Sequence, residues 1–182
     1  KGIVPGLLER WYAERKELQA KKKTAESDED KAFWDKRQLV KKINLNSLYG
    51  AILNPGCRFF DKRIGQSTTL TGRIIARHMD AYINECIFGT YDHVGQAIIY
   101  GDTDSCYFTA WPAVKEEVAA GRMEWNKETC VQLYDTIAEQ VNASFPAFME
   151  RACHCPRKMG ELIKGGRELV AEKGLYIKKK RY

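Results

Sequence analysis

The sequence has 182 residues, of which 44% are hydrophobic and 30% charged, and it carries a formal net charge of +6. This length suffices for one well-formed core, or for one compact domain with an appendage. No apolar run approaches membrane-spanning length, so the sequence predicts no transmembrane helix and no membrane partner.

The chain begins with two stretches that are typical of helices. Residues 7–24 and 31–50 are rich in strong helix formers. The acidic turn between them offers Ser27 or Asp28 as the cap of the second helix. Two helices of this length joined by a tight turn predict an antiparallel hairpin, and Gly50 is expected to close the second helix.

The middle of the chain mixes strand and helix signals. Residues 57–61 follow an Asn-Pro-Gly turn and predict a short strand, whereas an apolar stripe predicts a helix over residues 67–89 that stops at Gly89. Two β-like runs, residues 96–100 and 105–110, are separated by Gly-Asp-Thr-Asp. This pattern predicts a β-hairpin.

The last third of the chain is predicted to hold one more helix and one more strand. Residues 129–150 have helical periodicity, and Pro146 is expected to bend the end of this helix. Residues 173–182 are typical of a strand studded with cations. The predicted fold class is therefore α+β, with a helical hairpin followed by an antiparallel sheet that helices cover on one face. Unrelated proteins share this plan, so it does not by itself identify a function.

One face of the second predicted helix carries an unusual set of polar side chains. Lys42, Asn46 and Tyr49 lie at positions i, i+4 and i+7 and therefore share a face. An ammonium group, an amide and an aromatic ring suit a nucleotide, and Arg15 and Lys16 of the first helix could add cations to the cluster. A solvated helix face with one packed tyrosine is the alternative.

The tip of the predicted hairpin carries Asp102 and Asp104, one residue apart between two apolar runs. Gly101 is expected to allow the backbone angles that bring the two carboxylates together. A divalent ion relieves the repulsion between close carboxylates, and Mg²⁺ prefers oxygen ligands. A polar turn without metal is the alternative, because aspartate is a common turn residue.

The chain ends in a basic segment, residues 178–182, in which four cations precede a tyrosine. Such a segment suits contacts to phosphates or to a nucleic-acid groove, although basic tails are common. Residues 1–50 carry a net charge of +4, residues 51–156 carry −4 and residues 157–182 carry +6. Acidic metal ligands flanked by phosphate-binding segments would give this distribution, and solvated surface charge is the alternative.

The cysteines give no sign of a metal or redox site. Six are present, and none forms a CxxC pair. Neither a zinc ribbon nor a thioredoxin-type motif is therefore predicted. Reduced thiols in a cytoplasmic protein are expected.

Three of these segments together resemble family B DNA polymerases. Residues 42–50, "KINLNSLYG", match the K-x-x-x-N-S-x-Y-G helix of that family, and residues 100–105, "YGDTDS", match its catalytic-hairpin motif. Residues 178–182, "KKKRY", resemble its K-K-x-Y element, which contacts primer–template DNA. The motifs come in the family's order, and the resemblance covers nearly the whole chain. The short fingers and the lack of insertions look most like polymerases of T-even-type bacteriophages, which would place the protein in the cytoplasm of a bacterial host.

The resemblance implies a reaction and a set of site residues. Residues 1–54 would form the fingers and residues 55–182 most of the palm of an enzyme that transfers dNMP from a dNTP to a primer 3′-hydroxyl. Two Mg²⁺ ions, primer–template DNA and dNTP are the implied cofactors and partners. The implied residues are Asp104 and Asp102 as catalytic metal ligands, Lys42, Asn46, Tyr49 and Arg15 for the nucleotide, Lys179, Lys180 and Tyr182 for DNA, and Glu168 as a further acidic residue near the site.

The sequence departs from the family pattern in two places. Gln19 stands where a second basic residue usually follows the arginine matched by Arg15, and Lys22 or Lys23 could substitute for it. The family's other metal-binding aspartate belongs to a D-x-x-S-L-Y-P motif that does not occur in these 182 residues. The chain is therefore expected to be a piece of a polymerase, inactive alone, that needs the remaining segments in cis or as another chain. A non-catalytic DNA-binding or assembly chain of a split polymerase is the alternative.

Overall fold

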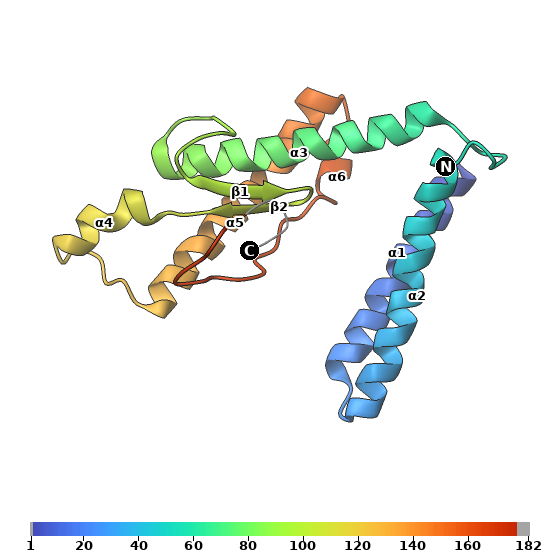
Figure 1. Ribbon diagram of the computed structural model, residues 1–182, viewed down its shortest axis with the longest axis horizontal. Helices are drawn as coiled ribbons and strands as arrows, with labels where there is room; N and C mark the ends of the chain where they lie inside the picture. The colour runs from blue at the N-terminus through green and yellow to red at the C-terminus, as the bar shows by residue number, and fades with distance from the viewer. Residues whose placement is uncertain (1, 178–182) are drawn as a thin grey trace. The chain divides into compact units, whose positions relative to one another are not determined.

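The computed structural model describes residues 2–177 and divides the chain into two compact units, residues 1–68 and 69–182. The described residues form six helices and a two-stranded antiparallel sheet (Figure 1). This mostly helical arrangement is consistent with the predicted α+β class. None of the described helices combines the length and the apolar character that crossing a membrane requires.

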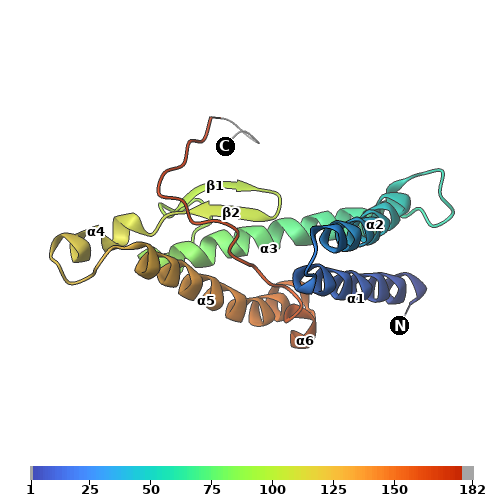
Figure 2. The same cartoon turned by 90° about the horizontal axis from the view of Figure 1, so that it is seen from below.

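The first unit contains the predicted helical hairpin, formed by α1 (Ile3–Thr24) and α2 (Asp28–Leu53), which lie side by side (Figures 1 and 2). Ser27 caps α2, as one of the two predicted alternatives, because its hydroxyl accepts a hydrogen bond from the Asp30 N–H at 3.0 Å. Acidic residues fill the first turn of α2 and lysines fill the last turn of α1, so both helix ends have charges that complement the helix dipole.

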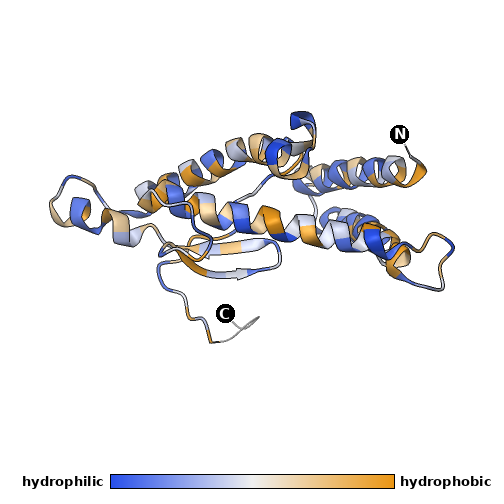
Figure 3. Ribbon diagram, turned by 90° about the horizontal axis from the view of Figure 1, so that it is seen from above, coloured by the Kyte–Doolittle hydropathy of each residue, from blue (hydrophilic) through white to orange (hydrophobic). Residues whose placement is uncertain are grey.

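Half-buried side chains and polar contacts, rather than a fully buried core, link the two helices of this hairpin. None of the residues of α1 is buried, and Ile52 alone is buried in α2. Hydrophobic and hydrophilic residues alternate along both helices (Figure 3). Three side-chain pairs cross between them: Glu14 with Lys41, Arg15 with Gln38, and Lys22 with Asp35.

The prediction that Gly50 closes α2 is wrong. The helix continues through Gly50 to Leu53, and Asn54 follows it with extended backbone angles. Pro55 explains this end, because a proline disfavours helical geometry in the residue that precedes it. Gly50 therefore adopts ordinary helical geometry, and its lack of a side chain serves no capping role.

The predicted strand over residues 57–61 is also wrong, because this segment forms turns. The Asn54 side chain accepts a hydrogen bond from the Gly56 N–H at 2.9 Å, and the Cys57 N–H binds the Asn54 carbonyl at 2.9 Å. Asp61 then accepts the N–H of residue 63 at 2.9 Å where the next helix begins. These local bonds use the polar groups that a strand partner would otherwise have to satisfy.

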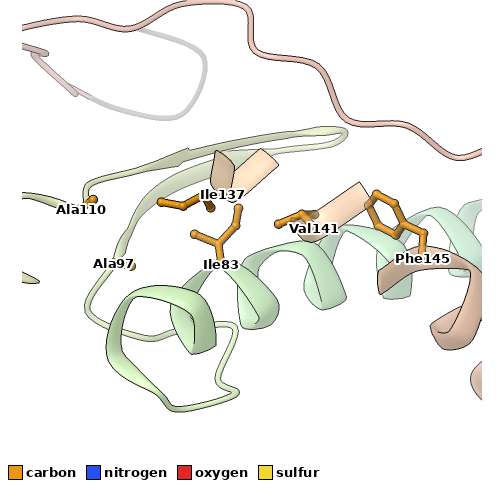
Figure 4. Close-up of a cluster of buried hydrophobic side chains, with 6 residues drawn as sticks. All are labelled: Ile83, Ala97, Ala110, Ile137, Val141 and Phe145. Carbon is orange, nitrogen blue, oxygen red and sulfur yellow. The ribbon is translucent and has the colours of Figure 1, made fainter. Parts of the chain in front are cut away.

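The second unit is built around α3 (Lys62–Phe88), which begins in the first unit, together with β1 (Ile98–Asp102), β2 (Ser105–Phe108) and α5 (Lys127–Cys153). The prediction for α3 is confirmed, with an earlier start, and Gly89 ends it at φ +74°. The predicted β-hairpin is confirmed as well, and α3 and α5 lie on the same side of it (Figure 2). The core cluster joins these elements through Ile83, Ala97, Ala110, Ile137, Val141 and Phe145 (Figure 4).

The remainder of the second unit differs in part from the sequence-based prediction. The predicted helix over residues 129–150 is confirmed, but α5 continues through Pro146 to Cys153. Two short helices, α4 (Trp111–Ala119) and α6 (Arg157–Gly160), were not predicted. Residues 173–177 form no strand, and residues 178–182 of that predicted strand lie outside the described residues.

A buried histidine links α3 to α5. His78 Nε2 lies 2.8 Å from the Ser144 hydroxyl, and Nδ1 lies 2.7 Å from the Tyr91 hydroxyl. Ser144 donates its own proton to the Val141 carbonyl, so Nε2 carries the hydrogen and Nδ1 accepts from Tyr91. The imidazole ring also stacks on Phe148 at a centroid distance of 3.9 Å. His78 is therefore a neutral structural residue.

A buried amide fixes the connection from α3 to β1. The Asn84 side chain donates to the Thr90 carbonyl at 2.8 Å and accepts the Ala97 N–H at 3.1 Å. Gly95 packs directly against this amide, since a Cβ there would lie 2.1 Å from the Asn84 Cγ. Asn84 thus determines where β1 begins.

Candidate functional site

The turn between β1 and β2 is tight and strained. Asp102 ends β1 and pairs with Ser105, the first residue of β2. Between them Thr103 has φ +56°, and the Asp104 N–H binds the Asp102 carbonyl at 2.6 Å. This bond between residues i and i+2 defines a γ-turn of the rare kind with positive φ. A β-branched residue in that region is an outlier, and such outliers cluster at functional sites.

The expectation that Gly101 supplies the special backbone angles is wrong. Gly101 is paired with Cys106 inside the ladder and is not among the residues with positive φ. Thr103 takes that conformation instead, because the two-residue connection places the bend after Asp102.

The two carboxylates of the turn differ in exposure. Asp102 is half-buried, and its Oδ1 accepts a hydrogen bond from the Thr103 hydroxyl at 3.2 Å. Asp104 is exposed, and within residues 2–177 its side chain makes no hydrogen bond or ion pair. Both side chains keep oxygen lone pairs for a ligand, and carboxylate oxygens are what Mg²⁺ and other hard cations prefer. The donor chemistry therefore fits a divalent cation.

The turn does not by itself provide a complete metal site. Within residues 2–177 no group of three or more histidine, cysteine, aspartate or glutamate side chains is arranged to hold an ion. Asp102 and Asp104 alone therefore do not complete a metal site.

The two faces of the hairpin have different environments. Ile98, Cys106 and Phe108 pack against the core cluster. On the opposite face the rings of Tyr100 and Tyr107 lie 5.7 Å apart, and Tyr176 covers them at 6.0 and 5.7 Å. Because side chains alternate along a strand, Asp102 shares the face of Tyr100. The half-buried carboxylate therefore lies beside an aromatic surface.

One acidic residue near the hairpin was missed by the sequence-based reasoning. Asp80 of α3 is half-buried near the hairpin, where a Cβ added at Gly101 would lie 3.8 Å from its Oδ2. Burial raises the pKa of Asp80, while Cys106 and His93 lower it by less. Burial, followed by the nearby Asp80, raises the pKa of the Cys106 thiol strongly. In sequence, a single carboxylate beside an apolar helical stripe gives no signal of this proximity.

The predicted nucleotide-binding side chains of α2 lie within one continuous helix of the first unit. Lys42 and Asn46 are exposed, and neither makes a hydrogen bond or ion pair within residues 2–177. Tyr49 is half-buried, and its hydroxyl donates to the Gly65 carbonyl at 3.2 Å. The ammonium and the amide are thus available to a ligand, whereas the tyrosine ring is held in place.

The cationic side chains of the helical hairpin of α1 and α2 differ in whether another side chain already binds them. Arg15 donates its Nε to Gln38 at 3.2 Å, which leaves the terminal nitrogens of the guanidinium. Lys41 pairs with Glu14, and this bond lowers the pKa of the exposed Glu14. Lys22, which could have substituted for the missing basic residue at position 19, binds Asp35 at 2.6 Å.

The remaining predicted residues lie near the end of the chain. Glu168 is exposed on an irregular segment, and it makes no hydrogen bond or ion pair with the rest of residues 2–177. Its neighbour Arg167 pairs with Asp135 of α5 at 2.5 Å. Lys179, Lys180 and Tyr182 lie outside the described residues.

Comparison with known proteins relates these features to one family. The family model described as DNA polymerase family B matches residues 1–146. A DNA polymerase of Pyrococcus glycovorans is 29% identical over 149 residues, which are 82% of this chain and 17% of that protein. The DNA polymerase delta catalytic subunit of Oryza sativa subsp. japonica is 36% identical over 107 residues, which are 58% of this chain and 10% of that protein.

A bacterial relative gives a shorter match. DNA polymerase II of Escherichia coli (strain K12) is 39% identical over 79 residues, which are 43% of this chain and 9% of that protein. The chain thus spans less than a fifth of the length of the curated relatives named here. No solved structure matches it significantly.

Proposed function

Since the chain belongs to DNA polymerase family B, we propose that it is the part of a DNA-directed DNA polymerase that holds the fingers and most of the palm. The reaction is the template-directed transfer of dNMP from a dNTP to a primer 3′-hydroxyl. The observation that carries the proposal is the strained turn with its two carboxylates, Asp102 and Asp104, on a hairpin anchored to a packed core.

The fingers of this proposal are residues 1–54, and their role is to bind the dNTP. Lys42 has an exposed ammonium that would neutralise triphosphate oxygens, and Arg15 keeps its terminal nitrogens for the same purpose. Asn46 lies on the same face of α2. The ring of Tyr49, fixed by the bond of its hydroxyl to Gly65, would pack against the nascent base pair.

The palm of this proposal is residues 55–182, and its turn would hold metal through Asp104 and Asp102. Two Mg²⁺ ions, when bound, would stabilise the charge that develops on the transferred phosphoryl group. The γ-turn keeps the backbone of the two aspartates fixed relative to each other, so their side chains need little reorganisation. Glu168 is proposed as a further acidic residue near the site.

The basic end of the chain is proposed to bind primer–template DNA through Lys179, Lys180 and Tyr182. The two lysines would contact backbone phosphates. These contacts position the duplex and carry no sequence information, as a replicative reaction requires.

The narrower part of the proposal assigns the chain to a polymerase of the T-even bacteriophage type, acting in the cytoplasm of a bacterial host. Its support is the short hairpin of α1 and α2, which are joined by only three residues, Ala25–Ser27. The relatives named above come from an archaeon, a plant and a bacterium, so they support the family rather than this subgroup.

We expect the isolated chain to have no primer-extension activity, because its turn supplies only part of a metal site. The experiment is Mg²⁺-dependent primer extension by the chain alone and by the chain mixed with a family B segment that carries D-x-x-S-L-Y-P. Extension only in the mixture supports the proposal. Extension by the chain alone contradicts the expected inactivity, and no extension in the mixture favours a non-catalytic DNA-binding or assembly chain.

Asp104→Ala in the active mixture tests the metal role of the turn. Turnover is expected to fall at least about 10³-fold while DNA affinity changes by less than about threefold, because the carboxylate acts on the transferred group rather than on the duplex. Asp135→Ala, which removes an exposed carboxylate of α5, is the matched control and should leave turnover unchanged. Unchanged turnover in Asp104→Ala would contradict the assignment.

A further inference from the structure

The segment that follows α6, residues 161–177 and here called the strap, forms neither helix nor strand but is held against α5. Gly160, the last residue of α6, is buried so close to α5 that an added Cβ would lie 2.7 Å from the Pro146 Cα. Ile163 then packs against the core cluster. From there the strap runs back along α5 toward the β-hairpin (Figure 2). Close packing therefore fixes where the strap begins.

The side chain of Asn142 on α5 binds the strap through a single residue. Its amide nitrogen donates to the Gly165 carbonyl at 2.9 Å, and its amide oxygen accepts the Gly165 N–H at 2.7 Å. Both residues are half-buried, so water competes less for these two bonds than it would at an exposed site. The amide thus satisfies both backbone groups of Gly165, which otherwise have no secondary structure to pair with.

The other polar contact of the strap is weaker. Arg167 pairs with Asp135, which lies two turns before Asn142 on the same face of α5. The two side chains of this ion pair are 39% and 45% exposed, and exposed ion pairs add little to stability. Within the described part of the chain, residues 168–175 make no hydrogen bond or ion pair. The course of the strap therefore depends mainly on Asn142.

The far end of the strap lies on the β-hairpin beside the proposed metal ligands. The ring of Tyr176 lies 6.0 Å from that of Tyr100 and 5.7 Å from that of Tyr107, centroid to centroid. Tyr100 precedes Asp102 by two residues, so both side chains lie on the same face of β1. The strap thus connects a fixed point on α5 to the face of the hairpin that carries a candidate metal ligand.

We propose that Asn142 is a positioning residue, which directs the strap so that Tyr176 covers the aromatic face of the β-hairpin. Lys179 and Lys180 follow Tyr176 by three and four residues in the sequence, so the place of Tyr176 limits how far these lysines can reach for DNA. This consequence rests on the proposed function, which assigns DNA binding to the two lysines. The contacts of Asn142 and Tyr176 do not depend on it.

The experiment uses the full 182-residue chain and three measurements. Hydrogen exchange of the Gly165 N–H reports its bond to Asn142 directly. Nuclear Overhauser contacts between the rings of Tyr176 and Tyr107 report the far end of the strap. Fluorescence anisotropy with a labelled primer–template duplex reports DNA binding. Exchange of the Thr109 N–H, which is bonded across the base of the β-hairpin, is the internal reference for an intact hairpin.

Asn142→Leu replaces the amide by an apolar side chain of similar size. It is expected to accelerate the exchange of the Gly165 N–H at least tenfold and to abolish the ring contacts of Tyr176. Duplex binding should weaken about five- to twentyfold, because a released strap lies in the binding position for only a fraction of the time. The exchange of the Thr109 N–H should change by less than about twofold, whereas a general loss of stability would accelerate both amides.

Gly165 offers a matched pair of variants. Gly165→Ala keeps both backbone groups, and its Cβ would lie 3.8 Å from the Asn142 Oδ1, an ordinary contact, so it should behave as the wild type does. Gly165→Pro removes the N–H and should resemble Asn142→Leu in ring contacts and duplex affinity. Asp135→Ala removes the exposed ion pair but keeps the bonds of Asn142. It should retain the ring contacts and a duplex affinity within about twofold of the wild type.

Each outcome decides the inference. A folded Asn142→Leu chain that keeps the ring contacts of Tyr176 would overturn it. If Asn142→Leu does not fold, equal behaviour of Gly165→Pro and Gly165→Ala overturns it, and a difference between them supports it. Lost ring contacts with unchanged duplex affinity would overturn the consequence for DNA. If the wild-type chain binds no duplex, the DNA role under the proposed function is contradicted, while exchange and ring contacts still decide whether Asn142 positions the strap.

Discussion

At the scale of single residues, Thr103 combines a β-branched side chain with a backbone conformation that suits glycine. Its hydroxyl donates a hydrogen bond to the carboxylate of Asp102, a candidate metal ligand. The same residue therefore has a strained backbone and a side chain that contacts the candidate ligand. The sequence did not reveal this strain. Positive backbone φ angles are usually expected at glycine, so Gly101 was predicted to adopt them instead of Thr103. The position of the strain is determined by the pairing of Asp102 with Ser105.

Thr103→Gly is expected to raise the free energy of unfolding by about 1 kcal/mol, because glycine adopts positive φ without the Cβ penalty. Urea denaturation measures the change. Thr103→Ala is the matched control: it also removes the hydroxyl bond to Asp102 but keeps a Cβ, so it should give no increase. Equal stabilities of the two variants would show that the turn is unstrained.

His78 is expected to make the stability of the chain depend on pH. Burial, with a smaller contribution from Arg151, lowers its pKa from 6.5 to about 4. The unfolded chain therefore takes up a proton at a higher pH than the folded chain does. The contribution of neutral His78 to the free energy of unfolding is fully present above pH 6.5 and is lost as the pH falls toward 4.

Between pH 7 and pH 4 this linkage should lower the free energy of unfolding by about 2–3 kcal/mol, measured by urea denaturation at several pH values. His78→Gln should flatten the dependence in this range, because glutamine does not titrate. An unaltered slope in His78→Gln would contradict the role of His78.

At the scale of elements, sequence signals correctly predicted helix ends that depend on bonds and backbone angles within a few residues. Ser27 caps α2 and Gly89 ends α3 because the bonds and angles involved lie within a few residues. One local signal failed: residues 57–61 have the composition of a strand, but turn bonds between near neighbours satisfy their polar groups. Asp80 could not be placed near the β-hairpin from sequence, because the two belong to different elements.

Two glycines next to the hairpin are expected to lose very different amounts of stability when they are replaced by alanine. Gly95→Ala should lower the free energy of unfolding by about 2–4 kcal/mol, because its Cβ would overlap the buried Asn84 amide and break its bonds to Thr90 and Ala97. Gly101→Ala should cost less than about 1 kcal/mol, since its nearest neighbour would be the Ser105 oxygen at 3.5 Å. Thermal denaturation of both variants measures the difference. Equal losses would mean that the packing of Asn84 against Gly95 is not specific.

At the scale of the whole molecule, the sequence predicted the family, the helical hairpin and the β-hairpin, because each has a motif or a periodic pattern. It did not predict how Lys42 and Lys41 differ, although they are adjacent: Lys41 is paired with Glu14, and Lys42 is exposed without an ion pair in the described residues. That difference depends on which face of α2 meets α1.

The paired helices of the first unit have Ile52 as their single fully buried residue, and apolar side chains such as Trp11 and Leu45 are only half-buried. Their length is therefore an adjustable dimension. Equal numbers of turns could be added to both helices, or removed from them, without rebuilding a fully buried core. A protein engineer could use the turn at Ala25–Ser27 to graft a reporter or to lengthen the helical hairpin, whereas β1 and β2 pack against a buried core cluster that fixes their position.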